Sequence, residues 1–352
     1  SLLKHRDLEF ICLTPFLSRG SVDYNKNIKE ITEIACKSNG GKLVDIPTFS
    51  DGNCQKSTWG GPEQWKSASL SIASYIVARQ EDYDSILLLA HDTIFSSVRK
   101  YIPQLDKLQM VWIPHSLGLV FNDEYTNPER LNIERESLLA ISQAKNDLVG
   151  YIGEASKEVL GKGYGVKPEK LVPLKNGLYL NSSRFNISKT QQQEDLRKWN
   201  IPMDKKLIFS WGRCVYQKGY DILIPACKPF LEANTDYHLV LLMPVETSPE
   251  NYLREIKNMA GTLPKNSITT IYAFEETLPY SLLRHQNLRI LAFSSRFEGA
   301  PITALEGLTF SRGDVQFIYS NIDPLQEVLR DDPRGTCIKD FEIDSLSAGL
   351  TY

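Results

Sequence analysis

The sequence predicts an α/β protein built from two doubly wound domains. Short apolar runs alternate with amphipathic stretches along the chain, as they do in successive βαβ units. This alternation pauses once, in a polar, glutamine-rich stretch at 188–200, and then restarts. The chain also has 352 residues, which is more than a single hydrophobic core comfortably supports. We therefore expect a first domain at 1–172 and a second at 173–352.

The first domain begins with an apolar run and continues in regular alternation. The runs predicted as strands are 8–13, 41–46, 84–90 and 109–114. The stretches predicted as helices are 26–38, 62–80, a short one before 109, and 128–143. The run "DSILLLA" at 84–90 has no polar alternation, which is typical of a strand buried on both faces of a parallel sheet.

The second domain repeats this pattern. Its predicted strands are 206–212, 238–244, 267–274, 287–295 and 314–320. Its predicted helices begin at Lys218, span 249–260, follow 274 as a short helix, and begin again at Pro301. Ligands of such sheets bind beyond the carboxyl ends of the strands, and in a two-domain protein a cleft between domains is the natural site.

Composition narrows the class of protein. The formal net charge of −3 gives no electrostatic reason to bind nucleic acid or an acidic membrane. No apolar run is long enough to span a bilayer, and the start "SLLKHRDLEF" lacks the apolar centre of a signal peptide. The six cysteines form no Cys-x-x-Cys pair, which favours a reduced compartment. We expect a cytoplasmic protein.

Two cations follow the first strand of the second domain. Arg213 and Lys218 lie in the loop and at the expected start of the next helix. A helix N-terminus presents free N–H groups and the positive end of the helix dipole, so it attracts phosphate. Added cations favour a diphosphate, above all one that gains charge as it leaves.

The segment "SSRFEGAPITALEG" at 294–307 carries two carboxylates eight positions apart. Pro301 suits the first turn of a helix, which places Glu298 in the loop before it and Glu306 within the helix. An ionised carboxylate only accepts hydrogen bonds, which matches the vicinal hydroxyls of a ribose or a hexose. Most glutamates in helices are simply exposed to solvent. Glu306 does not fit that explanation well, because it lies on an otherwise apolar helix face.

Three segments in order, "PLKNGLYLNSSRF" (173–185), "GRCVYQKGYDILIPA" (212–226) and "SRFEGAPITALEG" (295–307), resemble the retaining glycosyltransferases of family 4. The resemblance implies the GT-B fold, with Arg213 and Lys218 on the donor diphosphate. It implies that Glu306 binds the nucleotide ribose. Glu298 would lie beside the donor sugar, together with the backbone of Gly299, Ala300 and Pro301.

In the first domain the resemblance points to strand ends. His115, in "VWIPHSLG", resembles a histidine that contacts the donor sugar, and His91 with Asp92, in "LLLAHDTIF", resembles an acceptor-side segment. The family's paired-glycine loop after the first strand is reduced here to Gly20, so we expect Arg19 to supply charge in place of close backbone approach. "YAFEET" (272–277) stands where a glycine is more usual, and we expect it to bear on the nucleotide base.

The expected activity is transfer of a hexose from a nucleotide-sugar, UDP-glucose by family frequency, to a hydroxyl acceptor with retention of configuration and without a metal or other cofactor. The acceptor would be a carbohydrate or glycolipid, in polysaccharide or glycolipid assembly. The lysines of 24–37 leave peripheral contact with the inner face of a membrane open, but a solvated helix face is the commoner explanation of such a stretch. The chain ends at Tyr352, short of the family's closing helix, so we expect that helix to be missing.

Other classes of protein stay open. A sugar-nucleotide epimerase of the same architecture would need no acceptor, and a non-catalytic sugar-nucleotide-binding protein would show no turnover. A dinucleotide-dependent oxidoreductase is disfavoured because no G-x-G-x-x-G follows a strand. A metal-dependent transferase would use an Asp-x-Asp site. The sequence contains one at 82–84, which we interpret as a coincidence because Asp84 precedes a strand as a polar entry residue.

Overall fold

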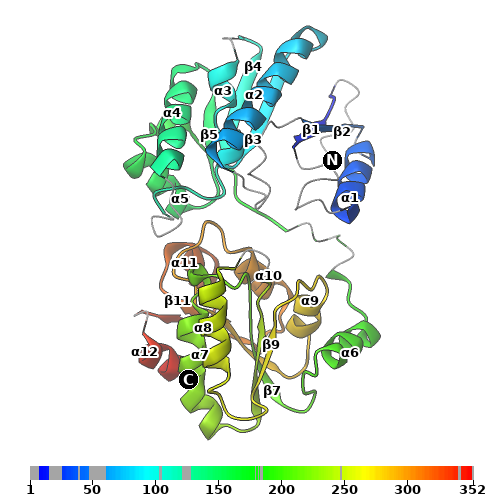
Figure 1. Cartoon of the computed structure of the whole chain (residues 1–352), viewed down its shortest axis with the longest axis vertical. Coiled ribbons are helices and arrows are strands. Elements are labelled where there is room, and N and C mark those ends of the chain that lie inside the picture. Colours follow the sequence, from blue (N-terminus) through cyan, green and yellow to red (C-terminus); the bar gives the residue numbers. More distant parts are fainter. Residues whose placement is uncertain are drawn as a thin grey trace. The chain divides into compact units, whose positions relative to one another are not determined.

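The structure is a computed structural model that describes residues 8–15, 26–38, 40–46, 61–102, 105–120, 128–178, 180, 182, 185–245, 248–339 and 342–350. The chain divides into two compact units, which are described separately (Figure 1). The first comprises residues 1–152 and 156–174, and the second comprises 153–155 and 175–352. The predicted assignment of acceptor binding to one domain and donor binding to the other stays a prediction.

The first unit contains two parallel sheets. Strands β1 and β2 form one, and β3, β4, β5 and β6 form the other in that order. The strands are β1 Ile11–Thr14, β2 Lys42–Asp45, β3 Ile86–His91, β4 Leu108–Ile113, β5 Leu148–Tyr151 and β6 Leu171–Pro173. The helices up to the boundary are α1 Lys26–Ser38, α2 Pro62–Arg79, α3 Val98–Tyr101, α4 Pro128–Gln143 and α5 Glu154–Glu158.

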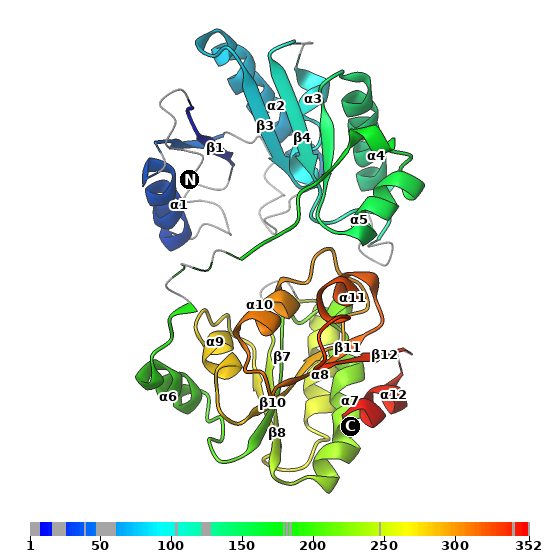
Figure 2. The same cartoon turned by 180° about the vertical axis from the view of Figure 1, so that it is seen from behind.

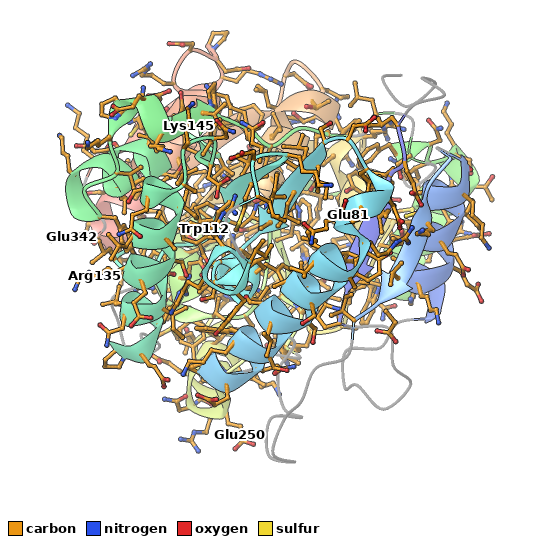
Figure 3. The ribbon with its side chains drawn as sticks, turned by 90° about the horizontal axis from the view of Figure 1, so that it is seen from above. Glu81, Trp112, Arg135, Lys145, Glu250 and Glu342 are labelled. Atoms are coloured by element: carbon orange, nitrogen blue, oxygen red, sulfur yellow. The ribbon has the colours of Figure 1, made fainter. Side chains whose placement is uncertain are left out.

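The core of the first unit lies between the four-stranded sheet and helices α2, α3 and α4. Trp112 on β4 is fully buried there, whereas charged side chains such as Arg135 point outward (Figure 3). The indole Nε1 of Trp112 donates to the carbonyl oxygen of Asp92 at 2.8 Å. This hydrogen bond connects β4 to the loop after β3. Large apolar residues therefore fix the strand ends at which the predicted site residues lie.

The predicted burial of 84–90 on both faces is wrong. Leu87 is 62% exposed and Leu89 50% exposed, while their neighbours Ile86 and Leu88 pack against the core. The reason is that only one face of β3 is covered: Ile86 and Leu88 pack in the core with α2, α3 and α4, whereas Leu87 and Leu89 point to the opposite face. An uninterrupted apolar run does not reveal whether both faces of the strand are covered.

Several elements were not predicted, and two of them have a clear physical reason. β5 is short and contains Gly150, which weakens a strand pattern, but a Cβ at this position would lie 2.8 Å from Leu174 and 3.1 Å from Ile113. The second is α6, Lys189–Lys198, which lies in the polar, glutamine-rich stretch where the alternation pauses. Ser188 caps it by accepting a hydrogen bond from the backbone N–H of Gln191, and the spacing of a capping box was visible in the sequence.

The second unit contains a six-stranded parallel sheet in the order β12-β11-β10-β7-β8-β9. Its strands are β7 Lys206–Trp211, β8 Tyr237–Leu242, β9 Ile268–Ile271, β10 Leu288–Phe293, β11 Gln316–Ser320 and β12 Gly335–Ile338. Its remaining helices are α7 Tyr220–Ala233, α8 Glu250–Ala260, α9 Leu278–Leu283, α10 Ile302–Phe310, α11 Asp323–Leu329 and α12 Ile343–Gly349.

Helices cover both faces of this sheet, as the doubly wound class requires. Helices α7, α8 and α12 lie over one face (Figure 1), and α6, α9, α10 and α11 lie over the other (Figure 2). The side chains of each set belong to a separate core. Alternate residues of each strand serve the two cores: Phe209 of β7 faces one and Ile208 the other. The predicted fold class, α/β with parallel sheets, is confirmed.

Candidate functional site

The sheet order places two distant segments side by side. β7 and β10 pair in parallel although about 80 residues separate them, so their carboxyl ends open at the same edge. The loop after β7 leads to α7, and the loop after β10 leads to α10. Gly219 lies where they meet, with φ of +65° and an ideal Cβ position only 2.1 Å from the carbonyl oxygen of Ser294. A side chain there would force the two loops apart.

The structure brings Lys218 and Glu298 together. The Lys218 ammonium donates to Glu298 Oε1 at 2.5 Å, and Ser295 Oγ donates to the same oxygen at 2.7 Å. Both side chains are largely buried, at 14% and 8% exposure. Lys218 closes a 3₁₀ turn at Tyr216–Lys218 rather than beginning the helix, which starts at Tyr220. The pair places a cation and a carboxylate at one strand-end edge.

Gln217 joins the second predicted cation to this pair. Its side-chain N–H₂ group donates to Glu298 Oε2 at 3.2 Å and to the carbonyl of Phe297 at 3.0 Å. Its side-chain oxygen lies 3.5 Å from Arg213 Nη2, at the limit of a hydrogen bond. Arg213 itself is exposed. Sequence reasoning missed Gln217, because a glutamine between two cations carries no spacing signal of its own.

Arg296, in the loop after β10, binds residues of the segment that follows β7. Its guanidinium forms two hydrogen bonds with the Asp221 carboxylate, at 2.8 and 2.5 Å, and lies 3.7 Å from the ring centroid of Tyr216. Tyr252 OH donates to the Asp221 carboxylate at 2.9 Å, and the backbone N–H of Arg296 donates to the backbone carbonyl of Gln217 at 2.8 Å. The planar fork of arginine suits this bidentate and stacked geometry, which lysine cannot reproduce. Sequence reasoning also missed this residue.

Glu306 has a separate partner. It lies in α10, is 7% exposed, and accepts a hydrogen bond from Tyr280 OH at 2.6 Å. Tyr280 belongs to α9, so the carboxylate is reached by a phenol from the neighbouring helix. The inward orientation agrees with the expectation that this glutamate is not an ordinary surface residue. Its predicted ribose contact is untested.

The segment Gly299–Pro301 connects the two glutamates. Pro301 lies immediately before Ile302, the first residue of α10, and its carbonyl accepts from the N–H of Leu305 at 3.1 Å. Gly299 and Ala300 are partly exposed, and their N–H groups have no hydrogen-bond partner among the residues that the structure describes. Such amides are available to an anion.

In the first unit the structure brings His91 and His115 together. His91 Nδ1 and His115 Nε2 are 2.9 Å apart, and the two rings are nearly parallel with centroids 5.2 Å apart. Burial lowers the pKa of both imidazoles, and His115 lowers that of His91 further. Both rings are therefore neutral at pH 7, so one ring can donate the shared hydrogen and the other can accept it.

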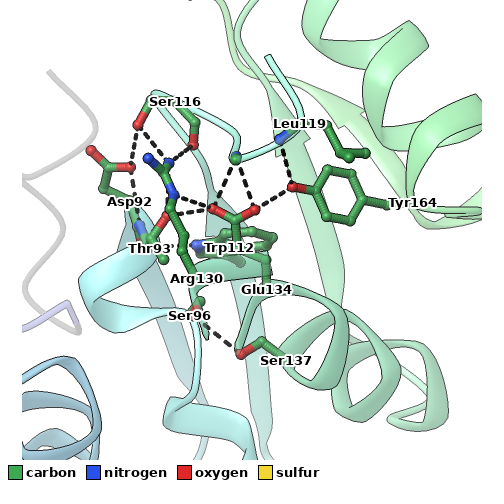
Figure 4. A network of polar contacts seen from close by, with 11 residues as sticks. Asp92, Thr93, Ser96, Trp112, Ser116, Leu119, Arg130, Glu134, Ser137 and Tyr164 are labelled. Carbon is green, nitrogen blue, oxygen red and sulfur yellow. Dashed lines mark hydrogen bonds and ion pairs between the residues drawn. The ribbon is translucent and has the colours of Figure 1, made fainter. Parts of the chain in front are cut away.

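Asp92 follows His91 in a strained conformation, with φ of +67°. Its Oδ1 accepts from the Thr93 N–H at 3.0 Å and lies 3.4 Å from Ser116 Oγ (Figure 4). Burial raises the pKa of this carboxyl to about 6. Residues held in such sparsely populated backbone conformations cluster at functional sites.

Other candidate residues fall elsewhere. Gly20 and Arg19 lie outside the described residues. The Asp-x-Asp segment lies at the amino end of β3, opposite to the histidines, and Asp82 there forms an ion pair with Arg79 at 2.9 Å. Within the described ranges, no group of three or more histidine, cysteine, aspartate or glutamate side chains could hold a metal ion. In the same ranges, no helix is long and apolar enough to cross a bilayer.

Comparison with known proteins adds independent information. Residues 191–352 match the family described as Glycosyl transferases group 1. Mannosylfructose-phosphate synthase of Agrobacterium fabrum (strain C58 / ATCC 33970) is 25% identical over 237 residues, which cover 61% of this chain and 50% of that protein. The alignment therefore spans only half the length of this curated relative.

Solved structures agree in fold. A glycosyltransferase from Rickettsia africae ESF-5 matches with a TM-score of 0.69 at 14% identity. The match covers 99% of this chain and 88% of the Rickettsia chain. Sucrose-phosphate synthase from Thermosynechococcus elongatus has a TM-score of 0.67 at 15% identity, covering 97% and 88%. The match over residues 191–352 agrees with the expected family, the glycosyl transferases group 1, and the likeness to these structures shows that the chain has the GT-B fold.

Proposed function

We propose that the chain transfers a hexose of glucose type from a UDP-sugar to a hydroxyl group of a carbohydrate or glycolipid, with retention of configuration and without a metal ion. The observation that carries this proposal is the pairing of Lys218 with Glu298 at the edge where β7 and β10 end, with Arg213 linked through Gln217. The match of residues 191–352 to a family of glycosyl transferases supports it. The hexose, the base and the acceptor rest on the resemblance alone.

In the proposed reaction the bond between the anomeric carbon and the β-phosphate oxygen breaks, and the acceptor oxygen forms the new bond on the same face of the sugar. The leaving phosphate oxygen takes the proton of the acceptor hydroxyl, so the products are the glycoside and UDP. Negative charge develops most strongly on the leaving diphosphate, where Lys218 and Arg213 would stabilise it. The backbone N–H groups of Gly299 and Ala300 would add donors around the sugar and phosphate.

The ion pair has a consequence for donor binding. A diphosphate that approaches Lys218 competes with Glu298 for the ammonium. When Lys218 turns to phosphate, Glu298 Oε1 gains accepting capacity for hydroxyls of the donor sugar, while Ser295 and Gln217 keep the carboxylate in place. Occupation of the diphosphate position would thus prepare the sugar position.

The first unit would supply the remaining contacts. We propose that His115 contacts the donor sugar, that His91 and Asp92 act on the acceptor side with Arg19, and that Gly20 approaches the donor. The neutral state of the histidine pair supports a role as hydrogen-bond donor and acceptor to hydroxyl groups rather than as a fixed charge.

The experiment measures transfer from UDP-glucose to a panel of sugar and glycolipid acceptors in the presence of a chelator. Lys218→Ala and Arg213→Ala should each lower turnover roughly 10²–10³-fold, because each removes a cation from the developing charge. Lys206→Ala is the matched control, since Lys206 lies at the opposite end of β7 in an exposed ion pair with Asp236. Near-native turnover of the Lys218 and Arg213 variants would contradict the electrostatic account, and loss of all activity in chelator would contradict metal independence.

Calorimetric titration identifies the nucleotide. UDP, GDP, UDP-glucose and GDP-mannose are titrated into native protein and Glu306→Ala. Binding of UDP that weakens in the variant is expected, because alanine lacks the carboxylate that would accept hydrogen bonds from the ribose hydroxyls. Absence of binding by every nucleotide would refute the transferase proposal, and conversion of UDP-glucose without an acceptor would indicate an epimerase.

A further inference from the structure

Glu134 is a fully buried carboxylate in helix α4, and none of the motifs in the sequence includes it. Its Oε1 accepts from Arg130 Nε at 2.7 Å and from Thr93 Oγ1 at 2.9 Å. Its Oε2 accepts from the Gly118 N–H at 3.0 Å and from the Tyr164 hydroxyl (Figure 4). The carboxylate is thus saturated by donors from separate segments of the chain.

Arg130 lies one helical turn before Glu134 and continues the network. Its Nη2 donates to the carbonyl and to the hydroxyl of Ser116, each at 2.9 Å, and lies 3.3 Å from Thr93 Oγ1 (Figure 4). The planar guanidinium therefore divides its donors between Glu134 and the loop after β4. Such fork geometry fixes orientation as well as distance.

The residues held by this network are next to the histidines. Thr93 is two residues after His91, and Ser116 immediately follows His115. β3 and β4 pair in register through His91 and Ile113, so both loops leave the same edge of the sheet. Asp92, between His91 and Thr93, has a positive φ, which a non-glycine residue keeps only when its surroundings over-determine it.

A purely stabilising role does not explain the choice of residues. Charges taken out of water lose hydration, and well-packed apolar side chains of similar volume often give equal or greater stability at such positions. What an apolar cluster cannot supply is directional contact with two particular loops. The network has that property, because its donors and acceptors come from the segments that follow both histidines.

We propose that Arg130 and Glu134 are positioning residues. They hold the loops after β3 and β4 so that His91 and Asp92, on the acceptor side, keep one geometry relative to His115, which contacts the donor sugar. The role of these loops in transfer rests on the proposed function. The positioning of the two histidines by the network does not. Neither residue touches the reacting groups in this account. They act through Thr93 and Ser116.

The test compares Glu134→Gln with a matched control, Asp147→Asn. Asp147 is also fully buried and also pairs with an arginine, Arg99, in the same unit, but it lies at the amino end of β5, away from the histidine loops. Both variants should lose stability. NMR titration of the histidine Cε1–H signals, assigned with His91→Gln and His115→Gln, should change for Glu134→Gln and stay native for Asp147→Asn.

Activity gives a second readout. Turnover of folded Glu134→Gln should fall by up to roughly 10²-fold through misplacement of the acceptor-side groups, while the UDP affinity of the second unit stays within about twofold of native. If Glu134→Gln does not fold, Thr93→Val and Thr93→Ser replace it in the test. The valine variant should show the altered histidine titration, and the serine variant, which keeps the hydroxyl, should restore it.

The two hypotheses fail differently. Unchanged histidine titrations in Glu134→Gln and Thr93→Val, or an equal change in Asp147→Asn, would overturn the positioning role whatever the enzyme does. If native protein shows no transfer while the titrations change as expected, the proposed function fails and the positioning role of Arg130 and Glu134 for the histidine pair stands.

Discussion

Gly219→Ala is expected to damage both the stability and the nucleotide site of the second unit. Gly219 has φ of +65°, a conformation that costs an L-residue about 1–2 kcal/mol. A new Cβ would also lie 2.1 Å from the carbonyl oxygen of Ser294, whereas real Cβ atoms essentially never approach within 3.0 Å. The neighbour is backbone at the end of β10, so it cannot turn aside as a flexible side chain would.

Forcing such a contact open adds about 1–3 kcal/mol of overpacking strain. The combined loss is about 2–5 kcal/mol, which lowers the midpoint of thermal unfolding by roughly 4–20 °C for a unit of this size. Ser294 Oγ donates to the Lys218 carbonyl at 2.8 Å, so the displacement of about 1 Å reaches the Lys218–Glu298 pair. Turnover should fall by roughly 10²-fold even in the folded fraction.

The assay combines calorimetry of thermal unfolding with UDP titration and turnover of the variant. Gly313→Ala serves as the control, because Gly313 is exposed and a Cβ there meets nothing within 4 Å. That variant should stay within about 0.5 kcal/mol of native stability. A Gly219→Ala protein that unfolds within about 1 °C of native and binds UDP normally would refute the reasoning about loop contact.

Three further predictions concern the same unit. Arg296→Lys should weaken donor binding at least about tenfold more than an Asp236→Ala control in titration calorimetry, because lysine keeps the charge but loses the bidentate pair with Asp221. Tyr280→Phe should lower stability by about 1 kcal/mol in urea unfolding and weaken UDP affinity, since the Glu306 carboxylate loses its fixed partner. Burial lowers the pKa of His238 from 6.5 to about 4, so the unfolded state binds the proton first and stability falls as pH drops from 6.5 toward 4, by about 3 kcal/mol. Between pH 7 and pH 4.5, the free energy of unfolding measured in urea should decrease less for His238→Gln than for native protein. Equal decreases in the two proteins would contradict this linkage.

Much of the fold could be predicted because local patterns decide local structure. The helix at 128–143 and the strand at 206–211 follow from apolar periodicity, and both are confirmed. The predictions failed where composition was misleading. Leu87 and Leu89 look like core residues in sequence, yet only the other face of β3, which carries Ile86 and Leu88, packs in the core.

The sequence by itself determined which residue types stand at strand ends: Arg213 and Lys218 after one strand, Glu298 after another, and His91 and His115 after two more. Only the tertiary structure decided which of them meet. Lys218 reaches Glu298 because β7 pairs with β10, and Glu134 reaches Thr93 and Gly118 because α4 packs against the loops after β3 and β4. Such contacts join residues far apart in the chain, and strand order and helix packing are set by burial of the whole core rather than by any local run of residues.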